Sequence, residues 1–246
     1  MPSLPASIGR LLPRDPSWQF LRLAARREIG RRAILSVEGS EHLPTTGPFT
    51  IAARHYHHLL DGCAIVATVA RPTHIVVGLD WAEGGIGTAM GGLCRAARWP
   101  VVFRPPLDGA GAPLAAGIDE TTRFRAFRTA MREAATLLQE GRVLVVFPEG
   151  YPNVDPHCTP KEGDAFLPFQ PGLMRFVRAA ENAGAGNGRV PVVPVGFRYE
   201  RIAPASGKGP EWRIAMRIGA PRFRAAFPDD ATALAAIEAD VRRLSA

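Results

Sequence analysis

The stretch FTIAARHYHHLLDGCAIVATVA, residues 49–70, joins two apolar runs through a polar turn that is rich in histidine. The first run, FTIAAR (49–54), is typical of a strand that is covered on both faces. The segment 60–70 is a helix candidate. A strand that leads directly into a helix indicates an α/β fold, in which functional side chains tend to lie in loops just beyond strand ends.

The same alternation continues along the rest of the chain. Further strands are expected at 74–78, 100–104, 142–147, 190–199 and 212–219, the last of them nearer a sheet edge because its apolar residues alternate. Further helices are expected at 16–33, 84–95, 119–140, 171–184 and 230–245. We therefore predict an N-terminal amphipathic segment (1–34) and one α/β domain (35–246), with a mostly parallel or mixed central sheet flanked by helices.

Composition narrows the class of protein. With 246 residues, 46% of them hydrophobic, the chain can bury a sizeable core. Cys63, Cys94 and Cys158 lie far apart and form neither a disulfide framework nor a zinc ribbon, which fits a reducing cytoplasm. The first residues contain no apolar core of a signal peptide, and the longest apolar runs are too short to span a bilayer. We expect a cytoplasmic protein.

The net charge of +7 favours anionic partners such as a membrane surface, a phosphorylated substrate or an acidic carrier protein. Nearly all of the basic residues are arginine, and Lys161 and Lys208 are the only lysines. No nucleic-acid-binding motif or zinc-finger spacing is present, so nucleic acid is not an expected partner.

The turn after the first quoted strand places His55, His57 and His58 ahead of Asp61. A His/Asp pair suits general-base catalysis, because the carboxylate fixes the imidazole tautomer and stabilises the cation that forms. His57 and Asp61 are four residues apart and would share a face of a continuous helix. His55 reaches Asp61 only if the chain folds back before the helix. The spacing therefore leaves both histidines open as the base.

Two other interpretations of the cluster remain. A His-x-His pair can bind a metal ion, as in a metallohydrolase, but His42, His74 and His157 form no second ligand pair and we expect no metal site. A hydrogen-bonded histidine run at a helix start is the other interpretation. The catalytic interpretation is favoured by FPEG (147–150), which follows the strand at 142–147. If the two strands are parallel neighbours, their loops converge.

These residues resemble the motifs of a known family, the PlsC-like glycerolphosphate acyltransferases, which include the lysophosphatidic acid acyltransferases. The family's first block is Asn-His, four residues and Asp at a strand end. Here Arg54 replaces the Asn, and one extra residue separates His55 from Asp61. The later blocks are matched in order by PVVFRPP (100–106), FPEG (147–150) with its continuation FLPFQPGLMRFV (166–177), and VPVVPVGF (190–197).

The resemblance, from roughly 35 to 245, implies acyl transfer in phospholipid biosynthesis. It implies that His55 is the general base, that Asp61 orients it, and that Glu149 accepts a hydrogen bond from a glycerol hydroxyl. The substrate-binding residues it implies are Arg104, for the acceptor phosphate, with Phe147, Pro148, Glu149 and Gly150. It implies no metal and no bound cofactor. Acyl-CoA or acyl-acyl carrier protein is the cosubstrate, and a lysophospholipid or related molecule is the acceptor.

A lipid acceptor must be reached at a membrane. Residues 17–33 mix Trp18, Phe20 and Leu23 with arginines, a composition that suits either an interfacial helix or an amphipathic helix packed on the sheet. We expect a peripheral protein on the inner face of the cell membrane. The alternatives are an acceptor other than a glycerophospholipid, or an inactive module that binds lipid or acyl carrier protein.

Overall fold

The computed structural model describes residues 16–80, 84–104, 118–156, 159–203 and 209–246. Its main sheet has six strands in the order β1-β8-β7-β2-β6-β3. These strands are β1 (Ala33–Glu38), β2 (Phe49–Ala53), β3 (Thr73–Ile75), β6 (Val143–Val146), β7 (Val192–Arg201) and β8 (Trp212–Ile218). A separate two-stranded sheet pairs β4 (Val77–Gly78) with β5 (Val101–Val102).

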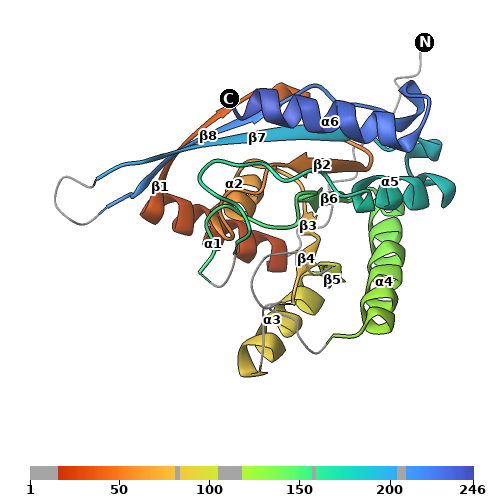
Figure 1. Ribbon diagram of the computed structural model, residues 1–246, viewed down its shortest axis with the longest axis horizontal. Coiled ribbons are helices and arrows are strands. Elements are labelled where there is room, and N and C mark those ends of the chain that lie inside the picture. The colour runs from red at the N-terminus through yellow and green to blue at the C-terminus, as the bar shows by residue number, and fades with distance from the viewer. Residues whose placement is uncertain (1–15, 81–83, 105–117, 157–158, 204–208) are drawn as a thin grey trace, which may run out of the picture.

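Helices cover both faces of the main sheet (Figure 1), with α1 and α2 on one side and α5 and α6 on the other. The helices are α1 (Pro16–Arg32), α2 (Leu60–Thr68), α3 (Gly84–Ala96), α4 (Glu120–Gln139), α5 (Gly172–Asn182) and α6 (Asp230–Leu244). Short 3-10 turns span Ser40–His42, Ala185–Gly188 and Arg224–Ala226. None of the described helices combines the length and hydropathy that a membrane span requires.

The central strands are buried on both faces because successive side chains enter opposite cores. In β2, Ile51 and Ala53 pack with α1 and α2, whereas Ala52 packs with α4, α5 and α6. In β6, Val145 joins the first core and Leu144 the second. This explains why these strands read as continuous apolar runs. The predicted α/β architecture with a mixed sheet is confirmed.

Strand direction brings the two loops with candidate chemistry together. β2 is parallel to β6 on one side and to β7 on the other, while β8 runs antiparallel to β7. Parallel strands end at the same edge of a sheet, so the turn after β2 and the FPEG turn after β6 lie side by side. The convergence expected from the sequence is therefore present.

Two parts of the sheet differ from the sequence prediction. The strand β1 was not predicted. Among the described strands it lies at the sheet edge and pairs with β8, and most of its residues are exposed, so it lacks a strong apolar signal. The single strand expected at 74–78 is split, because Ile75 ends its pairing with β6 and Val77 pairs instead with Val101. The strand expected at 100–104 belongs to this small second sheet.

Helix α6 packs closely on β7 at Gly196. A Cβ atom at Gly196 would lie 2.4 Å from the carbonyl carbon of Leu244, closer than any real Cβ contact. The hydroxyl of Ser245 accepts a hydrogen bond from the N–H of Phe197, one residue further along β7. The glycine thus lets the end of α6 lie against the strand whose next residues reach the candidate site.

Candidate active site

His55 and Asp61 meet in the turn between β2 and α2. Nδ1 of His55 lies 3.1 Å from Oδ2 of Asp61, and the Asp61 side chain is fully buried. The N–H groups of Tyr56 and His57 donate to the same oxygen over 2.6 Å and 2.9 Å. The chain therefore wraps around the carboxylate before α2 begins at Leu60, and the turn accommodates the extra residue between His55 and Asp61.

The imidazole of His55 is held on one face by Phe147, the first residue of FPEG. The two rings stack with centroids 4.4 Å apart and planes 21° apart, and 15% of the His55 side chain remains exposed. Because Nδ1 faces Asp61, Nε2 is the ring nitrogen left for chemistry. Among the described residues, His55 Nε2 has no hydrogen-bond partner.

The second oxygen of Asp61 is bound by a residue far along the chain. The hydroxyl of Tyr199, on β7, donates to Asp61 Oδ1 over 2.6 Å. The Tyr199 ring stacks on Tyr56 at 4.3 Å and meets the edge of Trp212 at 5.6 Å. Burial, reinforced by the Asp61 charge, raises the pKa of Tyr199 well above its ordinary value. Tyr199 therefore stays a hydrogen-bond donor at neutral pH.

Glu149 holds the backbone of His55 from the other side. Its Oε1 accepts from the His55 N–H at 2.9 Å, and its Oε2 accepts from the Leu167 N–H at 2.9 Å. Lys161 Nζ lies 2.6 Å from Oε2 of Glu149, donates to the His55 carbonyl at 2.8 Å and to Asn153 Oδ1 at 3.2 Å. Glu149 and Lys161 thus form a buried ion pair that fixes both backbone groups of His55. The expectation that Glu149 binds a glycerol hydroxyl stays a prediction.

Arg104 lies beyond β5 and is joined to the FPEG turn. Its guanidinium forms a two-pronged ion pair with Asp80, with Nε and Nη2 both 2.9 Å or less from carboxylate oxygens. Nη1 donates to the carbonyl of Gly150 at 2.9 Å, and the guanidinium lies 4.0 Å from the Tyr151 ring centroid. The structure therefore brings Arg104 to the FPEG turn, whose Phe147 stacks on His55. Its predicted role in phosphate binding stays a prediction.

Arg54, which stands at the family's Asn position, is a structural residue. It is buried, donates to the carbonyls of Phe197 and Asp164, and lies over the rings of Tyr56 and Phe166. Desolvation lowers its pKa, while Glu149 and Asp164 oppose the shift. Arg54 thus links the strand end of β2 to β7 and to the loop after FPEG.

Comparison with known proteins assigns the family. A family model described as Acyltransferase matches residues 34–198, and this range holds His55, Asp61, Arg104 and FPEG. The chain belongs to the acyltransferase family. The fold is similar to the crystal structure of the 1-acyl-sn-glycerophosphate (LPA) acyltransferase PlsC from Thermotoga maritima. The TM-score is 0.60 and the identity 21%, over 92% of this chain and 77% of that chain. A comparison with curated proteins found no match.

The other two histidines of the turn have structural contacts in this acyltransferase. His57 is buried, and its Nδ1 accepts from the N–H groups of Leu59 and Leu60, the residues that open α2. It therefore provides a hydrogen-bond acceptor for N–H groups that have no partner within the helix. His58 is exposed and contacts the carbonyl of Val154. Among the described residues, no three His, Cys, Asp or Glu side chains form a metal-binding group.

The buried position of His57 predicts a pH-dependent stability. Burial, with a contribution from His58, lowers the pKa of His57 from 6.5 to about 4. Between these pH values the unfolded chain binds a proton that the folded chain excludes. The free energy of unfolding therefore keeps its full value above about pH 6.5 and falls as the pH decreases towards 4. The total loss is about 3 kcal/mol, at 1.36 kcal/mol per pKa unit.

The variant His57→Asn tests this prediction, because Asn also offers an acceptor to the helix N–H groups but does not titrate. Urea unfolding at a series of pH values between 7 and 4 should show a smaller loss of stability in the variant than in the wild type. Equal pH dependence in the two proteins would show that His57 does not titrate as described.

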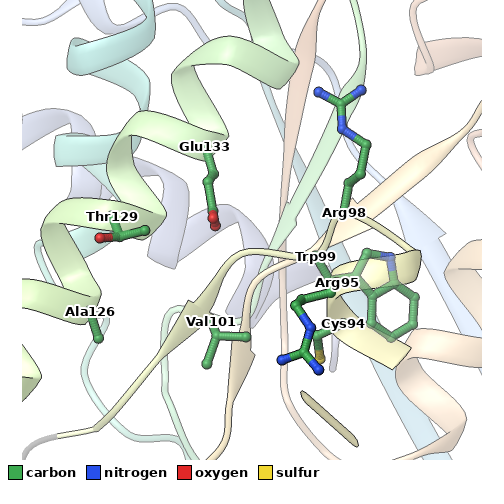
Figure 2. A pocket seen from close by; sticks show the side chains of 8 residues that line it. All are labelled: Cys94, Arg95, Arg98, Trp99, Val101, Ala126, Thr129 and Glu133. Atoms are coloured by element: carbon green, nitrogen blue, oxygen red, sulfur yellow. The ribbon is translucent and has the colours of Figure 1, made fainter. Parts of the chain in front are cut away.

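A cavity of about 440 Å³ lies apart from the His55–Asp61 pair, between the end of α3 and one face of α4 (Figure 2). Figure 2 shows Arg95 and Glu133 approaching it from opposite sides. The lining residues are Cys94, Arg95, Arg98, Trp99, Val101, Ala126, Thr129 and Glu133. None of them contacts His55 or Asp61, so the cavity is separate from the site built around these two residues.

Sequence reasoning missed four residues of the site: Tyr56, Asp80, Lys161 and Tyr199. Composition held a signal for three of them. The chain has only three tyrosines, and Tyr56, Tyr151 and Tyr199 all lie at the site. Lys161 is one of two lysines in an arginine-rich chain. A compact ammonium suits a point contact with three acceptors, which a planar guanidinium does not reproduce.

Proposed function

We propose that this acyltransferase moves a fatty acyl group from a thioester, acyl-CoA or acyl-acyl carrier protein, to a hydroxyl of a lysophospholipid or glycerol-phosphate type acceptor. The observation that carries the proposal is the contact of 3.1 Å between His55 Nδ1 and the buried Asp61 carboxylate. It provides an oriented imidazole at a strand end, beside the FPEG turn. The class of acceptor follows from the motif resemblance.

In the proposed reaction, Nε2 of His55 takes the proton of the acceptor hydroxyl while its oxygen attacks the thioester carbonyl carbon. A C–O bond forms, the C–S bond breaks, and the leaving thiolate takes the proton back from His55. Asp61 stabilises the imidazolium between these steps, since its charge is buried and lies against Nδ1. The reaction balances without a metal or redox partner.

Arg104 would bind the acceptor phosphate beside the catalytic histidine. Its Nε, one Nη1 hydrogen and one Nη2 hydrogen are used by Asp80 and Gly150. A guanidinium has five N–H donors, so the contacts with described residues leave two for an acceptor oxygen. Because Gly150 and Phe147 belong to one turn, a glycerol-phosphate headgroup bound at Arg104 would be held at the turn that also contacts the His55 ring.

Purified protein incubated with labelled acyl-CoA or acyl-acyl carrier protein and a panel of acceptors tests the proposal. The panel contains lysophosphatidic acid, glycerol 3-phosphate, lysophosphatidylcholine and monoacylglycerol. We expect transfer to a phosphate-bearing acceptor, detected as labelled lipid. If no acceptor is acylated by either donor, the protein is not an acyltransferase of this type.

A second candidate function, acylation of an acceptor without phosphate, is favoured by one contact. Asp80 forms a buried ion pair with Arg104 and balances its charge, which weakens the attraction for a phosphate dianion. In that case monoacylglycerol or another neutral hydroxyl lipid is the better acceptor in the same panel. Acylation of lysophosphatidic acid at a much higher kcat/KM than monoacylglycerol excludes this candidate.

We further propose that the protein works as a peripheral protein on the inner face of the cell membrane, with α1 at the lipid surface. One stripe of α1, formed by Trp18, Ala25 and Ile29, belongs to the core that α1 shares with α2. The outer stripe exposes Phe20 (75%) and Leu23 (67%) among arginines. Exposed apolar side chains beside basic groups favour binding to the surface of an anionic bilayer.

Flotation with phosphatidylglycerol-containing vesicles tests this role of α1. We expect the double variant Phe20→Ser and Leu23→Ser to bind vesicles at least about tenfold more weakly, since each side chain contributes about 1.5 kcal/mol or more when buried. Both residues are exposed, so folding should be unchanged, whereas deleting α1 would strip the core of Trp18 and Ile29. Phe124→Ser, at an exposed aromatic on α4, is the control. Undiminished binding of the double variant would exclude α1 as the membrane contact.

A further inference from the structure

The Asp61 carboxylate is bound unequally on its two oxygens. Oδ2 receives the N–H groups of Tyr56 and His57 as well as His55 Nδ1. Among the described residues, Oδ1 has one partner, the hydroxyl of Tyr199. A carboxylate is a rigid planar group, so rotation about the Cβ–Cγ bond moves both oxygens together. A donor on Oδ1 therefore also restrains Oδ2, and Tyr199 supplies that donor.

The Tyr199 hydroxyl is itself held rigidly. Its ring lies nearly parallel to Tyr56, with 13° between the planes, and nearly perpendicular to Trp212, with 82° between the planes. Tyr199 lies on β7 opposite Ile214 of β8, so its position is set by the paired strands. The hydroxyl is therefore positioned against Asp61 by the sheet and not by the turn that carries His55.

We propose that Tyr199 is a positioning residue for acyl transfer: its hydroxyl sets the plane of the Asp61 carboxylate, so that Oδ2 meets His55 Nδ1. This inference rests on the proposed function for its effect on rate. The contact is short, 2.6 Å, as expected for a hydroxyl that donates to a carboxylate anion. The arrangement extends the His55–Asp61 pair to a third residue, 138 positions from Asp61 in the chain.

The variant Tyr199→Phe removes this hydroxyl and keeps both ring contacts. We expect kcat to fall about 10- to 100-fold, the effect of losing one hydrogen bond to a charged group. KM should stay within about twofold, because Tyr199 contacts Asp61 and no substrate-binding residue. Thr50→Val is the matched control: it also removes a buried hydroxyl, on β2, and this hydroxyl has no partner among the described residues. Rates are compared below the unfolding transition, per mole of folded protein.

A second readout does not depend on activity. The Nδ1–H proton of His55 should give a downfield proton NMR resonance that disappears in His55→Gln. In Tyr199→Phe it should broaden or vanish, because an unheld carboxylate lets the proton exchange with water, while other resonances stay in place. An unchanged resonance with kcat within twofold of wild type overturns the proposal. If the wild type acylates no acceptor but this resonance still depends on Tyr199, the proposed function fails and the positioning role stands.

Discussion

Replacing His55 with alanine is expected to lower kcat for acyl transfer by about 10² to 10⁴-fold, the usual contribution of a general base. The reason is geometric: His55 is the histidine whose Nδ1 contacts the Asp61 carboxylate and whose Nε2 is left for the substrate. Labelled acyl transfer to the preferred acceptor, measured at saturating donor, gives the change in kcat. KM for the donor should change little.

His58→Ala and His57→Asn are the controls for this prediction. His58 is exposed, and within the part of the chain that the structure describes its side chain contacts the Val154 carbonyl and the His57 ring. Its replacement should therefore leave kcat within about twofold. Nδ1 of His57 accepts from the N–H groups at the start of α2, and the Asn side chain in His57→Asn also offers an acceptor there. If His57→Asn abolished transfer while His55→Ala retained it, the base would be His57, as helical spacing alone suggested.

The histidine cluster shows which features of the site the local sequence could predict and which it could not. Helical spacing pairs His57 with Asp61, but α2 begins only at Leu60, so both His57 and His55 precede the helix. The choice between them depends on a turn that is stabilised by the Asp61 carboxylate accepting backbone N–H groups. Periodicity describes regular elements and carries no information about such a turn. The motif order favoured His55 where spacing left both histidines open, and the role of His55 as the base stays a prediction.

The central sheet was predictable for a different reason. Buried parallel strands such as β2, β6 and β7 need apolar residues on both faces, which leaves a strong signal in the sequence. The edge strand β1 has a weak sequence signal, since it is largely exposed. The residues that contact the His55–Asp61 pair have no signal in the sequence around them. Tyr199 and Lys161 meet Asp61 and His55 across 138 and 106 positions of sequence, and only the sheet topology brings them there.

The buried pair of Lys161 and Glu149 leads to the largest expected effect on stability. Both side chains are fully shielded from solvent, and Nζ and Oε2 lie 2.6 Å apart. Desolvation lowers the pKa of Lys161, and the Glu149 charge opposes that shift. Lys161→Met would leave the Glu149 carboxylate buried without its cation and the His55 carbonyl without its donor. We expect the free energy of unfolding to fall by about 3 to 5 kcal/mol, measured by urea denaturation.

Two comparisons separate this effect from the general loss of an ion pair. Arg213 and Glu200 are also 2.6 Å apart, but their side chains are 54% and 60% exposed. Arg213→Met should therefore cost less than about 1 kcal/mol. The double variant Glu149→Gln and Lys161→Met should recover much of the lost stability, because a neutral amide oxygen can still accept from the His55 N–H and the buried carboxylate charge is removed together with its ammonium partner. A cost for Lys161→Met as small as that for Arg213→Met would mean that water reaches Glu149, and the fixed backbone of His55 would then need another explanation.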